Sequence, residues 1–149
     1  MARIADVAAR ILERCGRMTT MKLQKLTFYS QAAYLAQTGS PIFREDFYAW
    51  VNGPVSPVLF DQHRHKFFIY PGELVAEENA LSQEAVEIID TVCDELGTLS
   101  ANALVEKTHN EEPWIVARKG CDPRSRSREI ISKDSIKSYY RTNPVIRAL

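Results

Sequence analysis

The sequence has few cysteines and no long apolar run. Its three cysteines, Cys15, Cys93 and Cys121, are odd in number and widely spaced, which argues against a disulfide framework. We therefore expect reduced thiols, with Cys15 and Cys93 as small core residues. No apolar run approaches the roughly 20 residues that a membrane-spanning helix needs. The opening Met-Ala-Arg-Ile-Ala-Asp has an early acid and does not resemble a secretory signal, so we expect a cytoplasmic protein.

An excess of charge of either sign is also absent, because 19 Lys and Arg residues balance 19 Asp and Glu residues. The charges are unevenly placed: residues 1–66 and 118–147 are mainly basic, and residues 71–112 are mainly acidic. Such blocks are typical either of solvated helix faces or of a field that steers an oppositely charged protein partner. The basic cluster of Arg124, Arg126 and Arg128 lacks interleaved aromatic residues, so we do not expect nucleic-acid binding.

No catalytic or metal-binding motif is recognisable. His63 and His65 are two residues apart and would not share a face of a helix, so a zinc site is not expected. His109 and Cys121 lack any sign of an activated thiol, and His109 is expected to tie its loop to the turn at Trp114. The prolines that follow Gly53 remove N–H donors that a phosphate loop needs. The sequence therefore predicts a binding module rather than an enzyme, with no cofactor and no metal.

The apolar spacing predicts a mainly α-helical single domain over residues 1–149. A chain of this length can bury a core of its own. We expect about five to seven helices, with Thr19 or Thr20, Ser82, Ser100 and Ser132 as N-caps and Gly39 and Gly97 near helix ends. The clearest helices are predicted over residues 2–15, 20–37, 57–65 and 83–96, followed by shorter ones after Ser100, near Pro113 and after Ser132.

The helix over residues 20–37 is expected to pack through one stripe. That stripe would consist of Leu23, Leu26, Ser30, Ala33 and Tyr34. Lys22 and Lys25 fall elsewhere on the helical wheel, so we expect both side chains to face solvent.

Two short aromatic segments, residues 47–51 and 67–70, read as strands. They could pair as a small two- or three-stranded antiparallel ribbon that packs on helices. Asn52-Gly53-Pro54 is expected to end the first strand in a rigid turn, with Gly53 at positive φ. Trp50 and this turn would hold the ribbon against the helix over residues 20–37.

One stretch, residues 21–62, carries an unusual order of motifs. These are Lys22-Leu23-Gln24-Lys25-Leu26, Tyr29, Ala33-Tyr34-Leu35, the Gly39-x-Pro41 turn, Ala49-Trp50 and Gly53-Pro54-Val55. Further along the chain come His109, Pro113-Trp114, Ile130-Ile131 and Tyr139-Tyr140. In this order the sequence resembles the SocA-like Panacea domain, a phage-associated family tied to toxin–antitoxin pairs.

The resemblance implies an antitoxin that neutralises a cognate protein toxin by direct binding. It also raises an adaptor role, in which the toxin is handed to a ClpXP-type protease. The alternative, from another class, is a phage or prophage accessory protein that binds and inhibits a host enzyme or defence component. The expected partner-binding residues are Lys22, Gln24, Lys25, Tyr29, Trp50, Asn52, Gly53, Pro54, Val55 and Trp114.

Overall fold

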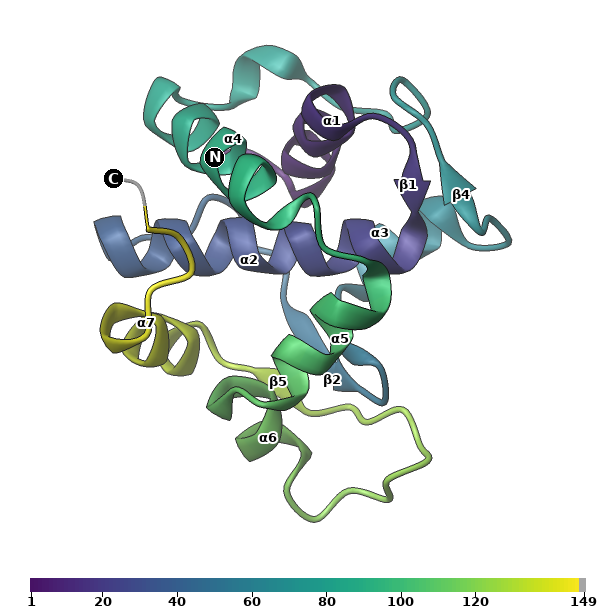
Figure 1. The fold of residues 1–149 in the computed structure, drawn as a ribbon, viewed down its shortest axis with the longest axis vertical. Helices are drawn as coiled ribbons and strands as arrows, with labels where there is room; N and C mark the ends of the chain where they lie inside the picture. The colour runs from purple at the N-terminus through teal and green to yellow at the C-terminus, as the bar shows by residue number, and fades with distance from the viewer. Residues whose placement is uncertain (148–149) are drawn as a thin grey trace.

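The computed structural model describes residues 1–147; residues 148 and 149, which end the predicted domain, lie outside them. The described residues form seven α-helices, one 3-10 helix and two small antiparallel sheets (Figure 1). The helices are α1 (Ile4–Cys15), α2 (Thr20–Thr38), α3 (Pro57–His63), η1 (Glu78–Ala80), α4 (Gln83–Leu96), α5 (Ala101–His109), α6 (Glu112–Arg118) and α7 (Lys133–Thr142). The strands are β1 (Met18–Thr19), β2 (Phe47–Trp50), β3 (Gly53–Val55), β4 (Phe68–Ile69) and β5 (Ile130–Ile131). The predicted mainly helical single domain with small antiparallel sheets is confirmed.

Local capping chemistry sets the helix bounds. The Thr19 side chain accepts a hydrogen bond from the backbone N–H of Lys22 and starts α2. Ser82 starts α4 in the same way, and Gly97 follows its last residue. These caps were predicted and are confirmed, because a cap acts within one turn and is readable from the sequence alone.

Helix α2 runs through the middle of the molecule. In Figure 1 it lies between α1 and α4 on one side and α5, α6 and α7 on the other. Its buried residues include five polar side chains, Gln24, Lys25, Thr27, Ser30 and Gln31. A helix that is buried on all sides belongs to the centre of a fold. The expectation of a single buried stripe is therefore wrong, and so is the expectation that Lys25 faces solvent, since its exposed fraction is 1%.

The strands pair differently from the prediction. Strand β2 pairs with β3, with Trp50 opposite Gly53, and with β5, with Phe47 opposite Ile131. Strand β4 instead pairs with β1, with Ile69 opposite Met18. The predicted pairing of residues 47–51 with 67–70 is wrong because Val51 and Asn52 reverse the chain at once. The nearest partner of β2 is then β3, an edge strand that tolerates Pro54.

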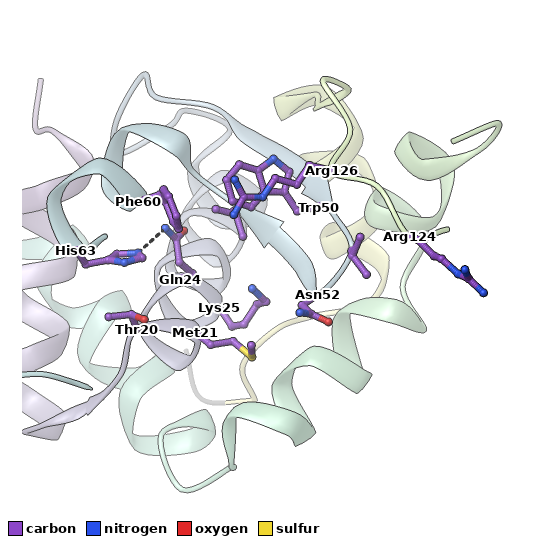
Figure 2. Close-up of a pocket in the computed structure, with 12 residues that line it drawn as sticks. Thr20, Met21, Gln24, Lys25, Trp50, Asn52, Phe60, His63, Arg124 and Arg126 are labelled. Carbon is purple, nitrogen blue, oxygen red and sulfur yellow. Dashed lines mark hydrogen bonds between the residues drawn. The ribbon is translucent and has the colours of Figure 1, made fainter. Parts of the chain in front are cut away.

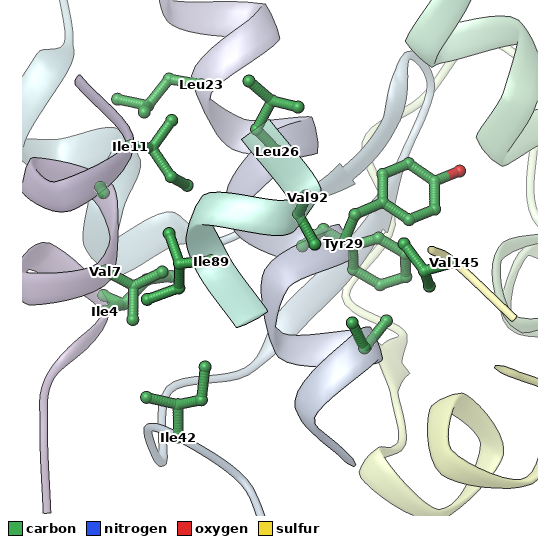
Figure 3. Packing of buried hydrophobic residues seen from close by; sticks show 14 of the residues in the cluster. Ile4, Val7, Ile11, Leu23, Leu26, Tyr29, Ile42, Ile89, Val92 and Val145 are labelled. Atoms are coloured by element: carbon green, nitrogen blue, oxygen red, sulfur yellow. The ribbon is translucent and has the colours of Figure 1, made fainter. Parts of the chain in front are cut away.

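The core fills both sides of α2 (Figure 3). Ile4, Val7 and Ile11 of α1 and Ile89 and Val92 of α4 all belong to this core, and their side chains are fully buried. Cys93 is buried as expected, whereas Cys15 is only half-buried.

On the other side of α2, aromatic rings pack edge to face. Phe28 and Phe47 have ring centroids 5.2 Å apart, and Tyr29 and Tyr140 have theirs 6.0 Å apart. Packing on both sides gives the first turns of α2 a rigid base. Among residues 1–147 no helix has both the length and the apolar character needed to cross a bilayer.

Candidate functional site

A pocket of about 410 Å³ opens beside the first turns of α2 (Figure 2). Its walls come from α2, the β2–β3 hairpin, α3 and the segment 119–129 that joins α6 to β5. The lining residues are Thr20, Met21, Gln24 and Lys25 from α2, Trp50, Val51, Asn52 and Val55 from the hairpin, Phe60 and His63 from α3, and Arg124 and Arg126 from the segment. Four parts of the chain that are distant in sequence therefore meet around one cavity.

Lys25 is the buried cation of this pocket. Its Nζ atom donates a hydrogen bond to the backbone oxygen of Pro54, 3.1 Å away. Figure 2 shows its amine directed into the space between Trp50 and Asn52. Burial lowers the pKa of Lys25 from 10.5 to about 7, because the charged form is poorly solvated there. No described residue that lines the pocket is an Asp or Glu that could compensate this charge.

Gly53 makes the burial of Lys25 sterically feasible. Its φ of +103° is the positive value expected from the sequence. A Cβ atom at this position would lie 2.6 Å from Cε of Lys25 and 2.7 Å from Oγ1 of Thr108. Both the backbone conformation and the close approach therefore require glycine.

Gln24 fastens the hairpin to α2 and α3. Its Oε1 atom accepts a hydrogen bond from the backbone N–H of Ser56 at 2.9 Å. Its Nε2 atom lies 3.2 Å from the Ser56 oxygen and 3.0 Å from Nε2 of His63. Because the amide nitrogen can only donate, Nε2 of His63 is the acceptor and this ring is neutral. Burial also lowers the pKa of His63, and the nearby Lys25 lowers it further.

Trp50 and Phe60 form an aromatic wall. Their ring centroids are 5.3 Å apart in an edge-to-face arrangement. The guanidinium of Arg126 lies 4.1 Å from the centroid of the Trp50 ring and 5.2 Å from that of Phe60. This is a cation–π contact at the pocket wall. The wall is thus apolar on its surface and positively charged at its edge.

Arg118 shapes the segment that carries Arg124 and Arg126. It is 9% exposed. Its guanidinium donates to the backbone oxygens of Ala49 at 3.0 Å, Ser125 at 2.7 Å and Asp122 at 2.6 Å. Three carbonyl contacts to one buried arginine tie segment 119–129 to strand β2.

Trp114 and His109 support the hairpin from outside the pocket. Nε1 of Trp114 donates to the backbone oxygen of Trp50 at 2.8 Å. The His109 ring stacks on Trp114 with centroids 4.1 Å apart, and its Nε2 donates to the backbone oxygen of Val51 at 2.9 Å. The predicted role of His109 in tying its loop to the Trp114 turn is confirmed.

Two other expected binding residues lie away from the pocket. The Nζ atom of Lys22 donates to the backbone oxygen of Gly97 at 2.6 Å. Tyr29 is fully buried, and its hydroxyl donates to Glu111, which also accepts from Tyr140 at 2.8 Å. Burial raises the pKa of both tyrosines, so they stay protonated as donors. This network belongs to the core.

The pocket therefore collects half of the expected binding residues. These are Gln24, Lys25, Trp50, Asn52 and Val55, with Gly53 and Pro54 directly behind Lys25.

Sequence reasoning missed several pocket residues. The three-residue spacing of Phe60 and His63 on a short helix was a usable signal for a shared face. Thr20 and Met21 gave no local signal. Arg126 belongs to a basic cluster in the sequence, and nothing local indicates its contact with Trp50, which is distant in sequence.

The titratable side chains offer no evident metal site. Among residues 1–147, His, Cys, Asp and Glu do not form a group of three or more that could hold a metal ion. His63 is buried and bonded to Gln24, while His65 is exposed. The pocket can therefore recognise a ligand through one buried amine, two arginines and an aromatic wall.

Comparison with known proteins gives a family match and a related protein. Residues 23–115 match the family described as antitoxin SocA-like, Panacea domain. The match takes in most of α2, the β2–β3 hairpin and α3. The chain is also similar to antitoxin SocA of Caulobacter vibrioides (strain NA1000 / CB15N), at 29% identity over 130 residues that cover 76% of this chain and 69% of that protein. No solved structure matches the chain. The chain belongs to the SocA-like Panacea domain family.

Proposed function

We propose that this protein is an antitoxin that neutralises a cognate protein toxin by direct, non-catalytic binding. The contact surface would be the face that carries the pocket. Gln24, Lys25, Trp50, Asn52 and Val55 would meet the toxin or position the groups that meet it. Gly53 and Pro54 would support Lys25 from behind, and Trp114 would hold the hairpin in place.

The observation that carries this proposal is an exposed aromatic patch beside the pocket, in a chain of an antitoxin family. Phe67, Phe68 and Tyr70 are 71%, 41% and 50% exposed. The backbone oxygen of Phe67 accepts a hydrogen bond from the N–H of Thr20, which lines the pocket. Large aromatic side chains gathered at a surface are typical of protein interaction sites.

The family supports a protein rather than a small molecule as the partner. Residues 23–115 include Gln24 and Lys25 of the α2 wall, the hairpin and α3 walls of the pocket, and the aromatic patch. The similar protein from Caulobacter vibrioides is itself named an antitoxin. Because Phe67 is hydrogen-bonded to Thr20 of the pocket wall, one protein partner could cover both the pocket and the aromatic patch.

The test is to express the toxin-like gene next to this one, with and without this protein. We expect growth arrest from the neighbouring gene alone and rescue on co-expression, with both proteins copurifying.

A Phe67→Ser, Tyr70→Ser variant should lose rescue while keeping its melting temperature, because both side chains are at least half exposed. Matched control substitutions are Val75→Ser and Val116→Ser, which change apolar residues that are 80% and 59% exposed. Identical growth arrest with and without this protein, and no copurifying partner, would refute the antitoxin proposal.

The same assay separates the remaining roles. An adaptor for a ClpXP-type protease would shorten the lifetime of the toxin when this protein is present. A phage accessory protein would instead copurify with a host enzyme or defence component and leave the neighbouring gene product unbound.

A further inference from the structure

We propose that the pocket is a carboxylate-binding site, in which a carboxylate of the protein partner forms an ion pair with Lys25 between Trp50 and Arg126. The carboxylate would belong to an acidic side chain or to the end of the partner chain. This inference rests on the proposed function and names the chemical group that the pocket recognises.

The charges of the pocket point to an anion. Lys25, Arg124 and Arg126 line it, and no Asp or Glu does so among the described residues. The other residues that line it are polar or apolar without charge, apart from the titratable His63. A guest with a negative charge would be attracted by all three cations and repelled by no carboxylate.

Lys25 has hydrogen-bond donors that a bound carboxylate could use. Its side chain is 99% buried, and among residues 1–147 its ammonium donates a hydrogen bond only to the Pro54 oxygen. An ammonium group carries three N–H donors, so two donors of Lys25 have no hydrogen-bond acceptor among the described residues. A carboxylate could take them as charge-assisted hydrogen bonds and would supply the counter-charge that the site lacks.

The apolar walls of the pocket indicate that the ligand carries an apolar chain next to its carboxylate. Trp50, Phe60, Val55 and Met21 line the same cavity. The side-chain amide of Gln24 is already hydrogen-bonded to Ser56 and His63, so we do not expect it to bind the ligand. The complementary shape is a short apolar chain that ends in a carboxylate.

Binding should be coupled to a proton. Burial holds the pKa of Lys25 at about 7, and a bound carboxylate would raise it. The other charged and titratable groups that line the pocket with Lys25 are His63 from α3 and Arg124 and Arg126 from the segment, and the Arg124 side chain points away from Lys25 (Figure 2); none lines the pocket from the hairpin. The pKa of His63 lies below its usual value, and the arginines stay charged, so neither changes charge above pH 7. The affinity for a carboxylate should then fall about tenfold for each pH unit above pH 7.

The first experiment uses a matched pair of probes on the purified protein. 4-Phenylbutyrate carries an apolar stem and a carboxylate, and 4-phenylbutyramide has the same shape without the charge. At pH 6.5 we expect the acid to shift the NMR signals of the Trp50 indole N–H and the Lys25 Cε, and to bind at least about tenfold more tightly than the amide. Equal binding of acid and amide, or shifts away from the pocket, would overturn the inference.

Substitutions then test the role of Lys25. Lys25→Met keeps the length of the side chain and removes the charge, so it should abolish the preference for the acid. Lys137→Met, which removes a lysine of α7 outside the pocket lining, should keep that preference. If Lys25→Met does not fold, wild-type protein still decides the question: binding that is unchanged between pH 7 and pH 9 would contradict the proposal.

A last arm separates a partner carboxylate from a free small molecule. With the toxin as partner, 4-phenylbutyrate should compete with complex formation, and Lys25→Met should bind the toxin at least about tenfold more weakly. If the probe binds but neither effect is seen, the pocket takes a free carboxylate and the inference fails while the antitoxin function stands. If the acid binds preferentially but no toxin is neutralised, the antitoxin function fails and the preference for a carboxylate remains.

Discussion

The side chain of Lys25 fills the space that a side chain at Gly53 would need: a Cβ on Gly53 would lie 2.6 Å from Cε of Lys25. The glycine lies in edge strand β3 and the lysine in central helix α2. Because Lys25 also donates to the neighbouring Pro54 oxygen, the two elements are joined at the point where the pocket begins. Lys25 can therefore be buried against β3 because Gly53 has no side chain.

The first prediction concerns this contact. Gly53→Ala should lower the free energy of unfolding by about 1–3 kcal/mol, because it adds both backbone strain at φ +103° and a clash with Lys25 and Thr108. Gly72→Ala is the matched control, since Gly72 has φ +88° and nothing within 4 Å of an added Cβ. Chemical denaturation of both variants measures the difference. A Gly53→Ala variant no less stable than the Gly72→Ala variant would show that the contact does not constrain the fold.

The second prediction follows from the depressed pKa of Lys25. Between about pH 7 and pH 10.5 the unfolded chain binds a proton at this lysine and the folded chain does not. Stability therefore rises with pH in this window, by up to about 1.4 kcal/mol per unit from this group. Below pH 7 both states are protonated and the contribution no longer changes.

Lys25→Met should remove this slope. Its free energy of unfolding relative to wild type should be most favourable near pH 7 and decline toward pH 10, as wild type recovers. Denaturation at several pH values checks this, with Lys137→Met as a control that keeps the wild-type slope. Parallel curves for wild type and Lys25→Met would mean that Lys25 titrates alike in both states.

Sequence reasoning succeeded where the interaction is local. Ser82 caps α4 through the N–H of Ala85, three residues away, and Gly97 follows the last turn. Such contacts depend only on neighbouring residues, so the helix ends could be predicted. The positive φ of Gly53 was readable for the same reason.

The failures concern contacts between distant segments. A helical wheel assigns Lys25 to solvent because it cannot include the second layer that packs on α2. The pairing of β4 with β1 needs Ile69 to meet Met18, and nothing local distinguishes this from pairing with β2. The pocket also depends on Arg118, whose three carbonyl partners come from β2 and segment 119–129. The motifs of residues 21–62 therefore indicated the right region, and the tertiary contacts determined which of its side chains surround a cavity.

The third prediction concerns the segment 119–129. Arg118→Gln loses the charged fork that holds the oxygens of Ala49, Asp122 and Ser125. We expect proteinase K to cleave within residues 119–129 at least about tenfold faster, since losing a charge-assisted bond costs about 1.5–3 kcal/mol. Arg128→Gln changes an exposed arginine of the same segment and should leave the cleavage rate unchanged. Equal cleavage rates for the two variants would indicate that Arg118 does not order the segment.

The final prediction concerns how the protein meets its toxin. Arg124 is an exposed residue at the pocket wall, in the mainly basic stretch of residues 118–147. If an acidic group of the toxin enters the pocket, the approach should be steered by charge, so the association rate should fall as salt rises. Arg124→Glu should slow association several-fold at low salt, with a smaller effect on dissociation, because rim charges act mainly on encounter. At 1 M salt, where charges are screened beyond about 3 Å, the variant should associate nearly as fast as wild type.

Lys137→Glu makes the same change of charge on α7, outside the pocket lining, and is the control. Stopped-flow or surface-based kinetics of the purified pair would measure both rates. An association rate that is insensitive to salt, or that falls equally for both variants, would mean that the pocket face does not guide the encounter.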